Sequence, residues 1–107
     1  MVPLDPTPAF VVSGNTLKAS GDISYEEEQN LEQALRDLFE TQQKVLIIDL
    51  SRVTYLNSSS VRLVAMAVIK AKQREVDLTV YACRKIMRLF EMAGIDKLGK
   101  LELVEPD

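Results

Sequence analysis

The stretch Val45-Leu46-Ile47-Ile48-Asp49-Leu50 decides the fold of this chain. It is a nearly continuous apolar run of strand length, a pattern typical of a strand that is covered on both faces. A second strand is expected over residues 77–82, and the residues between 61 and 71 carry apolar side chains at helical spacing. Strand, helix and strand in this order form a βαβ unit, whose crossover is right-handed in nearly all proteins. The run therefore predicts an α/β fold with parallel strands at its centre.

Further elements are expected on both sides of this unit. Upstream, Phe10-Val11-Val12 and Thr16-Leu17-Lys18-Ala19 favour an antiparallel hairpin, because the Gly14-Asn15 pair between them is a tight-turn sequence. Downstream, a third helix is expected to end at Gly94, because glycine adopts the left-handed conformation that closes helices. A short edge strand follows, with the residues Leu101, Leu103 and Val104.

The first helix is expected to begin at Ser24. The sequence Ser24-Tyr25-Glu26-Glu27 fits a capping box, in which the serine hydroxyl and the third-position carboxylate each accept a hydrogen bond from a free backbone N–H. The buried face of this helix is predicted by apolar residues at helical spacing, namely Leu31, Ala34, Leu35 and Leu38.

The length and composition indicate one folded domain over residues 1–107. The chain has 107 residues, of which 47% are hydrophobic and 27% charged, as in ordinary globular proteins. Residues 1–8 are expected to form an extended lead-in, because Pro3, Pro6 and Pro8 block regular structure.

The net charge and the cysteine content limit which cellular compartments and which classes of partner fit this chain. The net charge of −3 argues against a broad nucleic-acid surface. The single cysteine, Cys83, allows no internal disulfide and suits a reducing compartment. No apolar run approaches the roughly 20 residues of a membrane span, and residues 1–10 do not resemble a secretory signal. We therefore expect a cytoplasmic protein without membrane insertion.

The absence of histidine argues against catalysis. Histidine is the usual general base and the commonest metal ligand, and this chain has none. The sequence also holds no glycine-rich phosphate loop, no cluster of metal-ligating residues and no pair of nucleophile and base. We expect a protein that is not an enzyme and that needs neither a cofactor nor a metal.

The segment from Asp49 to Ser60 is the most informative for function. It is expected to connect the central strand to the second helix, and it ends in three serines that follow Asn57. One interpretation is structural, because Asn57 or Ser58 can cap the helix. The other is that a serine hydroxyl there accepts a phosphate, since a helix N-terminus favours anions. A phosphate carries a charge of about −1.5 to −2 and would repel a partner that docks at this corner. The residues alone leave both interpretations open.

Four motifs in this order resemble the STAS domain in its stand-alone form, the anti-sigma factor antagonist. They are Gly21-Asp22-Ile23, the run from Val45 to Leu50 followed by Ser51, Thr54-Tyr55-Leu56-Asn57-Ser58-Ser59, and the segment Ile86 to Leu98 with Gly94-Ile95-Asp96-Lys97-Leu98. The resemblance spans about residues 10–104. It implies a STAS-like fold, a small mixed β-sheet of four to five strands flanked by three to four α-helices.

The resemblance also implies a function. Stand-alone members work by partner switching. The unphosphorylated antagonist binds an anti-sigma factor that is also a serine kinase, phosphorylation of one serine releases it, and a serine phosphatase restores it. The acceptor position falls on Ser58, with Ser59 as a secondary candidate. The partner-binding residues implied in this way are Asp22, Asn57, Ser58, Ser59 and Arg62.

Two departures from the family motif keep an alternative open. Asn57 stands where the family usually has aspartate, and Ser60 where it usually has glycine. The extra hydroxyl of Ser60 is a further possible acceptor. The alternative function is a constitutive STAS scaffold subunit of a larger complex, of the lipid-transport or stress-sensing type, which phosphorylation does not control.

Several other side chains have both a structural and a functional interpretation. Leu63, Met66 and Ala67 either pack against the third helix, which we favour, or form an apolar partner surface beside Ser58. Arg62 lies one turn beyond Ser58 and suits either a phosphate or a partner's carboxylate, or is an ordinary exposed arginine. The basic cluster of Arg84, Lys85 and Arg88 suits an acidic partner or is simply solvated. For Cys83 we expect a buried small side chain and not a reactive thiol.

Overall fold

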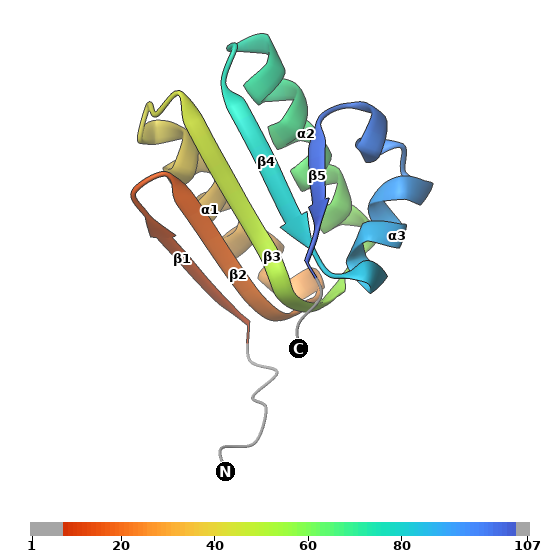
Figure 1. Ribbon diagram of the computed structural model, residues 1–107. Coiled ribbons are helices and arrows are strands. Elements are labelled where there is room, and N and C mark those ends of the chain that lie inside the picture. Colours follow the sequence, from red (N-terminus) through yellow and green to blue (C-terminus); the bar gives the residue numbers. More distant parts are fainter. Residues whose placement is uncertain (1–7, 105–107) are drawn as a thin grey trace.

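The computed structural model describes residues 8–104 (Figure 1). The predicted lead-in, apart from Pro8, and residues 105–107 lie outside this described part. The strands are β1 (Ala9–Ser13), β2 (Thr16–Ile23), β3 (Val45–Leu56), β4 (Asp77–Ala82) and β5 (Lys100–Leu103). The helices are α1 (Glu28–Glu40), α2 (Ser58–Gln73) and α3 (Arg84–Met92), with short 3-10 helices η1 (Tyr25–Glu27) and η2 (Ile95–Lys97). These elements confirm the predicted mixed sheet and helix content.

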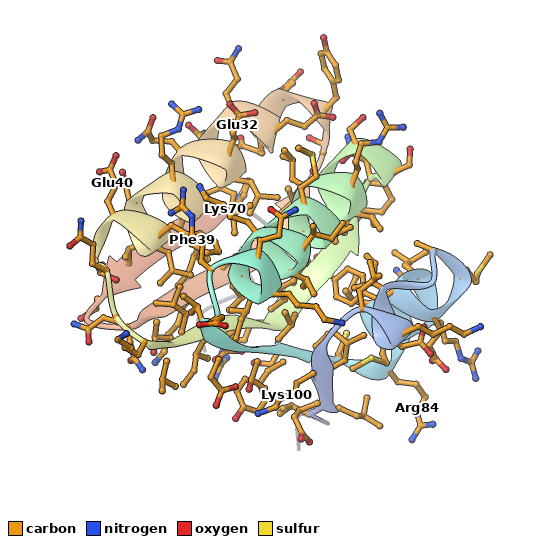
Figure 2. All side chains as sticks on the ribbon, turned by 90° about the horizontal axis from the view of Figure 1, so that it is seen from above. Glu32, Phe39, Glu40, Lys70, Arg84 and Lys100 are labelled. Atoms are coloured by element: carbon orange, nitrogen blue, oxygen red, sulfur yellow. The ribbon has the colours of Figure 1, made fainter. Side chains whose placement is uncertain are left out.

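The strands follow one another across the sheet in the order in which they occur in the chain. The order is β1-β2-β3-β4-β5, with β1 antiparallel to β2 and every later pair parallel. Each parallel pair is joined through a helix, so the chain always advances in the same direction across the sheet. Crossovers of one constant hand then place all the helices on the same face. Figures 1 and 2 show this arrangement, with α1, α2 and α3 together on one face of the sheet.

The prediction that residues 45–50 are covered on both faces is therefore wrong. Ile48 and Leu50 point into the core and are fully buried. Ile47 on the other face is only half-buried, and Val45 is 50% exposed. The uninterrupted apolar run reflects a strand at the middle of the sheet, but the sequential strand order leaves its second face without a helix.

The predicted hairpin is confirmed, and it is tied to the centre of the sheet. Gly14 has a φ of 59° in the turn between β1 and β2. Asn15 beside it donates from Nδ2 to the carbonyl oxygen of Val45 at 3.1 Å. The turn thus fixes the start of β3 as well as its own two strands.

The predicted capping box at Ser24 does not form. Ser24 precedes η1 and its side chain makes no capping hydrogen bond, whereas its carbonyl oxygen accepts from Glu27 N at 2.9 Å. The carboxylate of Glu27 accepts from Asn30 Nδ2 at 2.8 Å and so turns forward along the helix. Because a 3-10 turn intervenes, α1 begins at Glu28, four residues later than predicted.

Residues 51–56 were expected to connect a strand to a helix, and this expectation is also wrong. They continue β3 by pairing with β2 through Arg52, Val53, Tyr55 and Leu56. The pairing of β3 with β4 ends earlier, at Leu50 opposite Ala82. The end of β3 therefore extends beyond β4, and α2 begins almost directly where the strand stops.

The C-terminal elements agree with the predictions. Gly94 has a φ of 78° and follows Ala93, the C-cap of α3, and β5 is a short edge strand parallel to β4. Lys100 Nζ lies 2.8 Å from Asp77 Oδ1, and this contact raises the pKa of Lys100 above its ordinary value. Val104 lies just beyond the strand and donates its N–H to Ala82 O at 2.9 Å.

The two faces of the sheet can be compared with a matched pair of substitutions. Ile48→Ala should lower the free energy of unfolding by about 2 to 5 kcal/mol, because it leaves a cavity in the closed core. Ile47→Ala removes the same atoms from the neighbouring position on the open face and should cost about 1 kcal/mol. Urea unfolding of both variants measures the difference. Equal losses would mean that the second face is covered after all.

Candidate functional site

The start of α2 is closed by the side chain of Asn57. Asn57 has extended backbone angles, and its Oδ1 accepts a hydrogen bond from Ser60 N at 2.9 Å. This is the geometry of an N-cap, in which a side-chain oxygen satisfies one of the first free N–H groups of a helix. Of the two capping residues that the sequence allowed, the structure therefore selects Asn57.

The same amide also joins two helix starts. Asn57 Nδ2 donates to Glu28 Oε1 at 2.9 Å, and Glu28 is the first residue of α1. The backbone N–H of Asn57 donates to Ile23 O, at the end of β2, at 3.2 Å. An aspartate at residue 57 has no N–H to donate and would place a second carboxylate against Glu28. Asn57 stands where the family motif usually has aspartate, and its amide supplies the donor that the carboxylate of Glu28 accepts.

The three serines differ in exposure. Ser58 and Ser59 are exposed, whereas Ser60 is fully buried. Within residues 8–104, Ser60 Oγ has no hydrogen-bond partner. Ser60 is followed in the chain by Val61, which is buried too, so this side of the helix faces the core. We therefore discard Ser60 as an acceptor, because a kinase cannot reach a hydroxyl that is sealed from solvent.

Asp22 lies at the end of β2, in the strand next to the one that leads into α2. It is exposed, and its Oδ1 accepts a hydrogen bond from Thr54 Oγ1. Gly21 before it has a φ of 82°, a conformation that favours glycine, and the register with β3 shifts between Gly21 and Asp22. Asp22 then stands opposite Tyr55. The Gly21-Asp22 motif thus fixes the position of a carboxylate at this edge of the sheet.

Ser58 and Arg62 line a groove between α2 and α3. The groove has a volume of about 750 Å³ and also receives Lys85 from α3. Its apolar lining includes Tyr55, Ala65, Leu89 and Met92, of which Met92 is 86% exposed. Asn57 also borders the groove, whereas Asp22 and Ser59 do not line it. Of the predicted basic cluster, Lys85 alone is a lining residue.

The expected packing of Leu63, Met66 and Ala67 against the third helix is wrong. These residues line a separate groove on the other side of α2, together with Leu35 and Phe39 of α1. Helix α2 lies between α1 and α3 (Figure 2). Leu63 is two residues from Val61, about 200° around the helix, so the two side chains face opposite neighbours. Apolar spacing alone did not reveal which helix lies on which side.

No group of metal-ligating side chains gathers among the described residues, and the single cysteine lies against the backbone of β3. Among residues 8–104 no group of three metal-ligating side chains occurs. In the same range no helix has both the length and the apolar content that crossing a membrane requires. Cys83 is half-buried, less than expected, and its Sγ lies 3.7 Å from Val53 O.

Sequence reasoning missed Glu28 and Thr54, which hold Asn57 and Asp22 in place. One signal for Glu28 was available. In adjacent parallel strands, the helices that follow begin at the same edge of the sheet, so the first residues of the first two helices had to be neighbours. The contact of Thr54 depends on the register shift at Gly21, which the sequence pattern does not reveal.

Comparisons with known proteins agree with this architecture. A family model described as "Mlab, STAS domain" matches residues 9–105. Among solved structures, the crystal structure of an anti-sigma factor antagonist from Mycobacterium paratuberculosis superposes with a TM-score of 0.73 at 24% sequence identity. The match covers 94% of this chain and 86% of the other. A search of curated proteins found no match.

The bridge between Asn57 and Glu28 can be tested by exchanging donor and acceptor. Asn57→Asp should lower the free energy of unfolding by about 1 kcal/mol, because it removes the donor and brings two carboxylates together. Adding Glu28→Gln should restore most of the loss, because the glutamine amide can donate to the new aspartate. Urea unfolding of both single variants and the double variant gives the coupling. Purely additive effects would contradict the bridge.

The unpaired hydroxyl of Ser60 gives a further stability prediction. Ser60→Ala should leave stability unchanged or raise it by up to about 1 kcal/mol, because it removes a buried polar atom without a partner. Ser60→Gly, which installs the usual family residue, should be about 1 kcal/mol less stable than the alanine variant, because glycine weakens helices. Thermal unfolding ranks the three proteins. A clear loss in Ser60→Ala would indicate that the hydroxyl is bonded.

Proposed function

This chain belongs to the STAS family, and we propose that it is an anti-sigma factor antagonist that works by partner switching. In its unphosphorylated form it binds an anti-sigma factor that is also a serine kinase. Phosphorylation of Ser58 releases it, and a serine phosphatase returns it to the binding form. In this proposal the chain is a cytoplasmic signalling protein and carries out no reaction itself.

The observation that carries the proposal is the position of Ser58. It is exposed, it is the first residue of α2, and the capping hydrogen bond is made by Asn57. The Ser58 hydroxyl is therefore not needed to close the helix and can be modified without loss of the cap. The solved structure with which this chain superposes is that of an anti-sigma factor antagonist, which supports the same role.

A phosphate on Ser58 would act on the surface and leave the fold in place. At the helix N-terminus it would be stabilised by free N–H groups and by the helix dipole. It would also add a charge of about −1.5 to −2 beside an apolar groove. A partner seated there would have to desolvate that charge, so binding weakens without a large conformational change.

We assign roles to the other site residues from their positions in the structure. Ser59 is exposed and is the secondary acceptor. Asn57 positions the acceptor by capping the helix, whereas Asp22 and Arg62 contact the partner. The hydrogen bond from Thr54 holds the Asp22 carboxylate for that contact.

A second function is kept because of Asn57 and Ser60, the two departures from the family motif. In it the chain is a constitutive STAS subunit of a larger complex. The hydrogen bonds of Asn57 and the burial of Ser60 are purely structural features and serve this function equally well. It predicts stable co-purification with a partner whatever the state of residue 58.

A phosphorylation experiment distinguishes the two proposed functions. The chain is incubated with ATP and each small ATP-binding kinase encoded near its gene, and intact mass and peptide fragmentation locate the phosphate. We expect one phosphate, lost in Ser58→Ala and retained in Ser59→Ala, which is the matched control. Ser58→Glu should weaken binding to the anti-sigma factor at least about tenfold. Full modification of Ser58→Ala, or unchanged affinity of Ser58→Glu, would contradict partner switching at Ser58.

A further inference from the structure

Two grooves of similar size flank α2, and they differ in whether their charged side chains contact other groups of the molecule. The groove toward α1 has a volume of about 780 Å³ and the groove toward α3 about 750 Å³, so size does not distinguish them. In the α1 groove, Glu32 pairs with Arg36 at 3.1 Å and Lys70 lies 4.7 Å from the ring centre of Phe39 (Figure 2). Arg74, the remaining cation of this groove, lies 6.0 Å from the same ring centre. The charged side chains of the α1 groove thus each contact another group of the molecule, although the lining remains positively charged.

The α3 groove contains uncompensated positive charge. Its charged lining residues are Arg62 and Lys85, and none of its lining residues is acidic. Both side chains are exposed, and within residues 8–104 neither forms an ion pair. Around them lie Tyr55, Leu89 and Met92, large apolar side chains that are partly or mostly exposed. An exposed apolar surface bordered by unpaired cations fits an apolar helix edge that carries carboxylates.

We propose that the α2–α3 groove receives an acidic amphipathic helix of the protein partner, and that a phosphate on Ser58 displaces it by taking over Arg62 and Lys85. This inference rests on the proposed phosphorylation of Ser58 and adds the chemistry of the occupant and of its release. The partner's carboxylates and the phosphate compete for the same two cations.

Helical geometry supports the competition. Ser58 and Arg62 are four residues apart on α2, so their side chains are neighbours on the helix surface. Lys85 approaches the same groove from the start of α3. A guanidinium binds phosphate through two parallel hydrogen bonds, more strongly than it binds most single acceptors. Phosphorylation thus removes the attraction for the partner and at the same time adds repulsion.

The occupant can be tested with a defined probe. A helical peptide of about 18 residues, with leucines on one face and glutamates along its border, is compared with the same peptide carrying glutamine. We expect the acidic peptide to shift the amide resonances of α2 and α3 and to bind at least about fivefold more tightly. Arg62→Gln with Lys85→Gln should abolish the preference. The matched control, Lys70→Gln with Arg74→Gln, removes equal charge from the other groove and should retain it.

The competition can be tested by placing phosphoserine at residue 58 through an expanded genetic code. This form should bind the acidic peptide at least about fivefold more weakly. In a phosphorus NMR titration, the second pKa of the phosphoserine should lie below its ordinary value of about 6. Arg62→Gln or Lys85→Gln should raise it by roughly half a unit, whereas the control Lys72→Gln leaves it unchanged.

The outcomes separate this inference from the proposed function. Equal binding of both peptides, or shifts confined to the α1 groove, would overturn the acidic occupant. An unchanged phosphoserine pKa in both groove variants would overturn the competition, even where a kinase modifies Ser58. Conversely, if no kinase modifies Ser58, partner switching fails, but the peptide preference and its loss in the double variant still support the groove.

Discussion

The side-chain amide of Asn57 is the interaction on which the arrangement of the site depends. With its oxygen it closes α2, and with its nitrogen it holds the carboxylate of Glu28 at the start of α1. Neither contact uses a hydroxyl, so the exposed Ser58 is held in place without taking part in the bonding. A helix that needed this serine as its cap would be weakened by every modification of it. Under the proposed function, structure and regulation are therefore carried by different side chains.

A second constraint is topological. Because the strands follow one another in sequence order, the helices gather on one face and their N-termini collect at one edge of the sheet. The end of β3, extended beyond β4, places α2 at this edge between its two neighbours. The end of β2, which carries Asp22, and the start of α2 at Asn57 therefore meet at this edge, where Asn57 N donates to Ile23 O. The groove that contains Ser58 is a consequence of the same helix layer.

Much of this could be predicted from local sequence. The hairpin turn, the strand at 77–82 and the left-handed Gly94 are encoded by single residues or short patterns, and all are confirmed. The sequence offered Asn57 or Ser58 as the cap of α2, and the structure selects Asn57. Most of what failed depends on contacts between distant segments. The apolar run at 45–50 could not indicate that one face of the sheet lacks a helix. The capping box failed for a local reason, because Glu27 turns toward Asn30, three residues further along. The neighbours of α2 were likewise assigned to the wrong sides.

The site was predictable in its residue types and less so in its geometry. The serines stood out because a helix start needs only one capping residue. Arg62 stood out because it lies one turn beyond Ser58. The burial of Ser60 and the pairing of Asn57 with Glu28 follow from how α2 sits against the core and α1. The face of the sheet opposite the helices has a practical consequence. A fluorophore or a surface linker attached there, for example at Lys18, would stand clear of the whole helix layer, so immobilised or labelled protein can report on encounters at that layer without obstructing them.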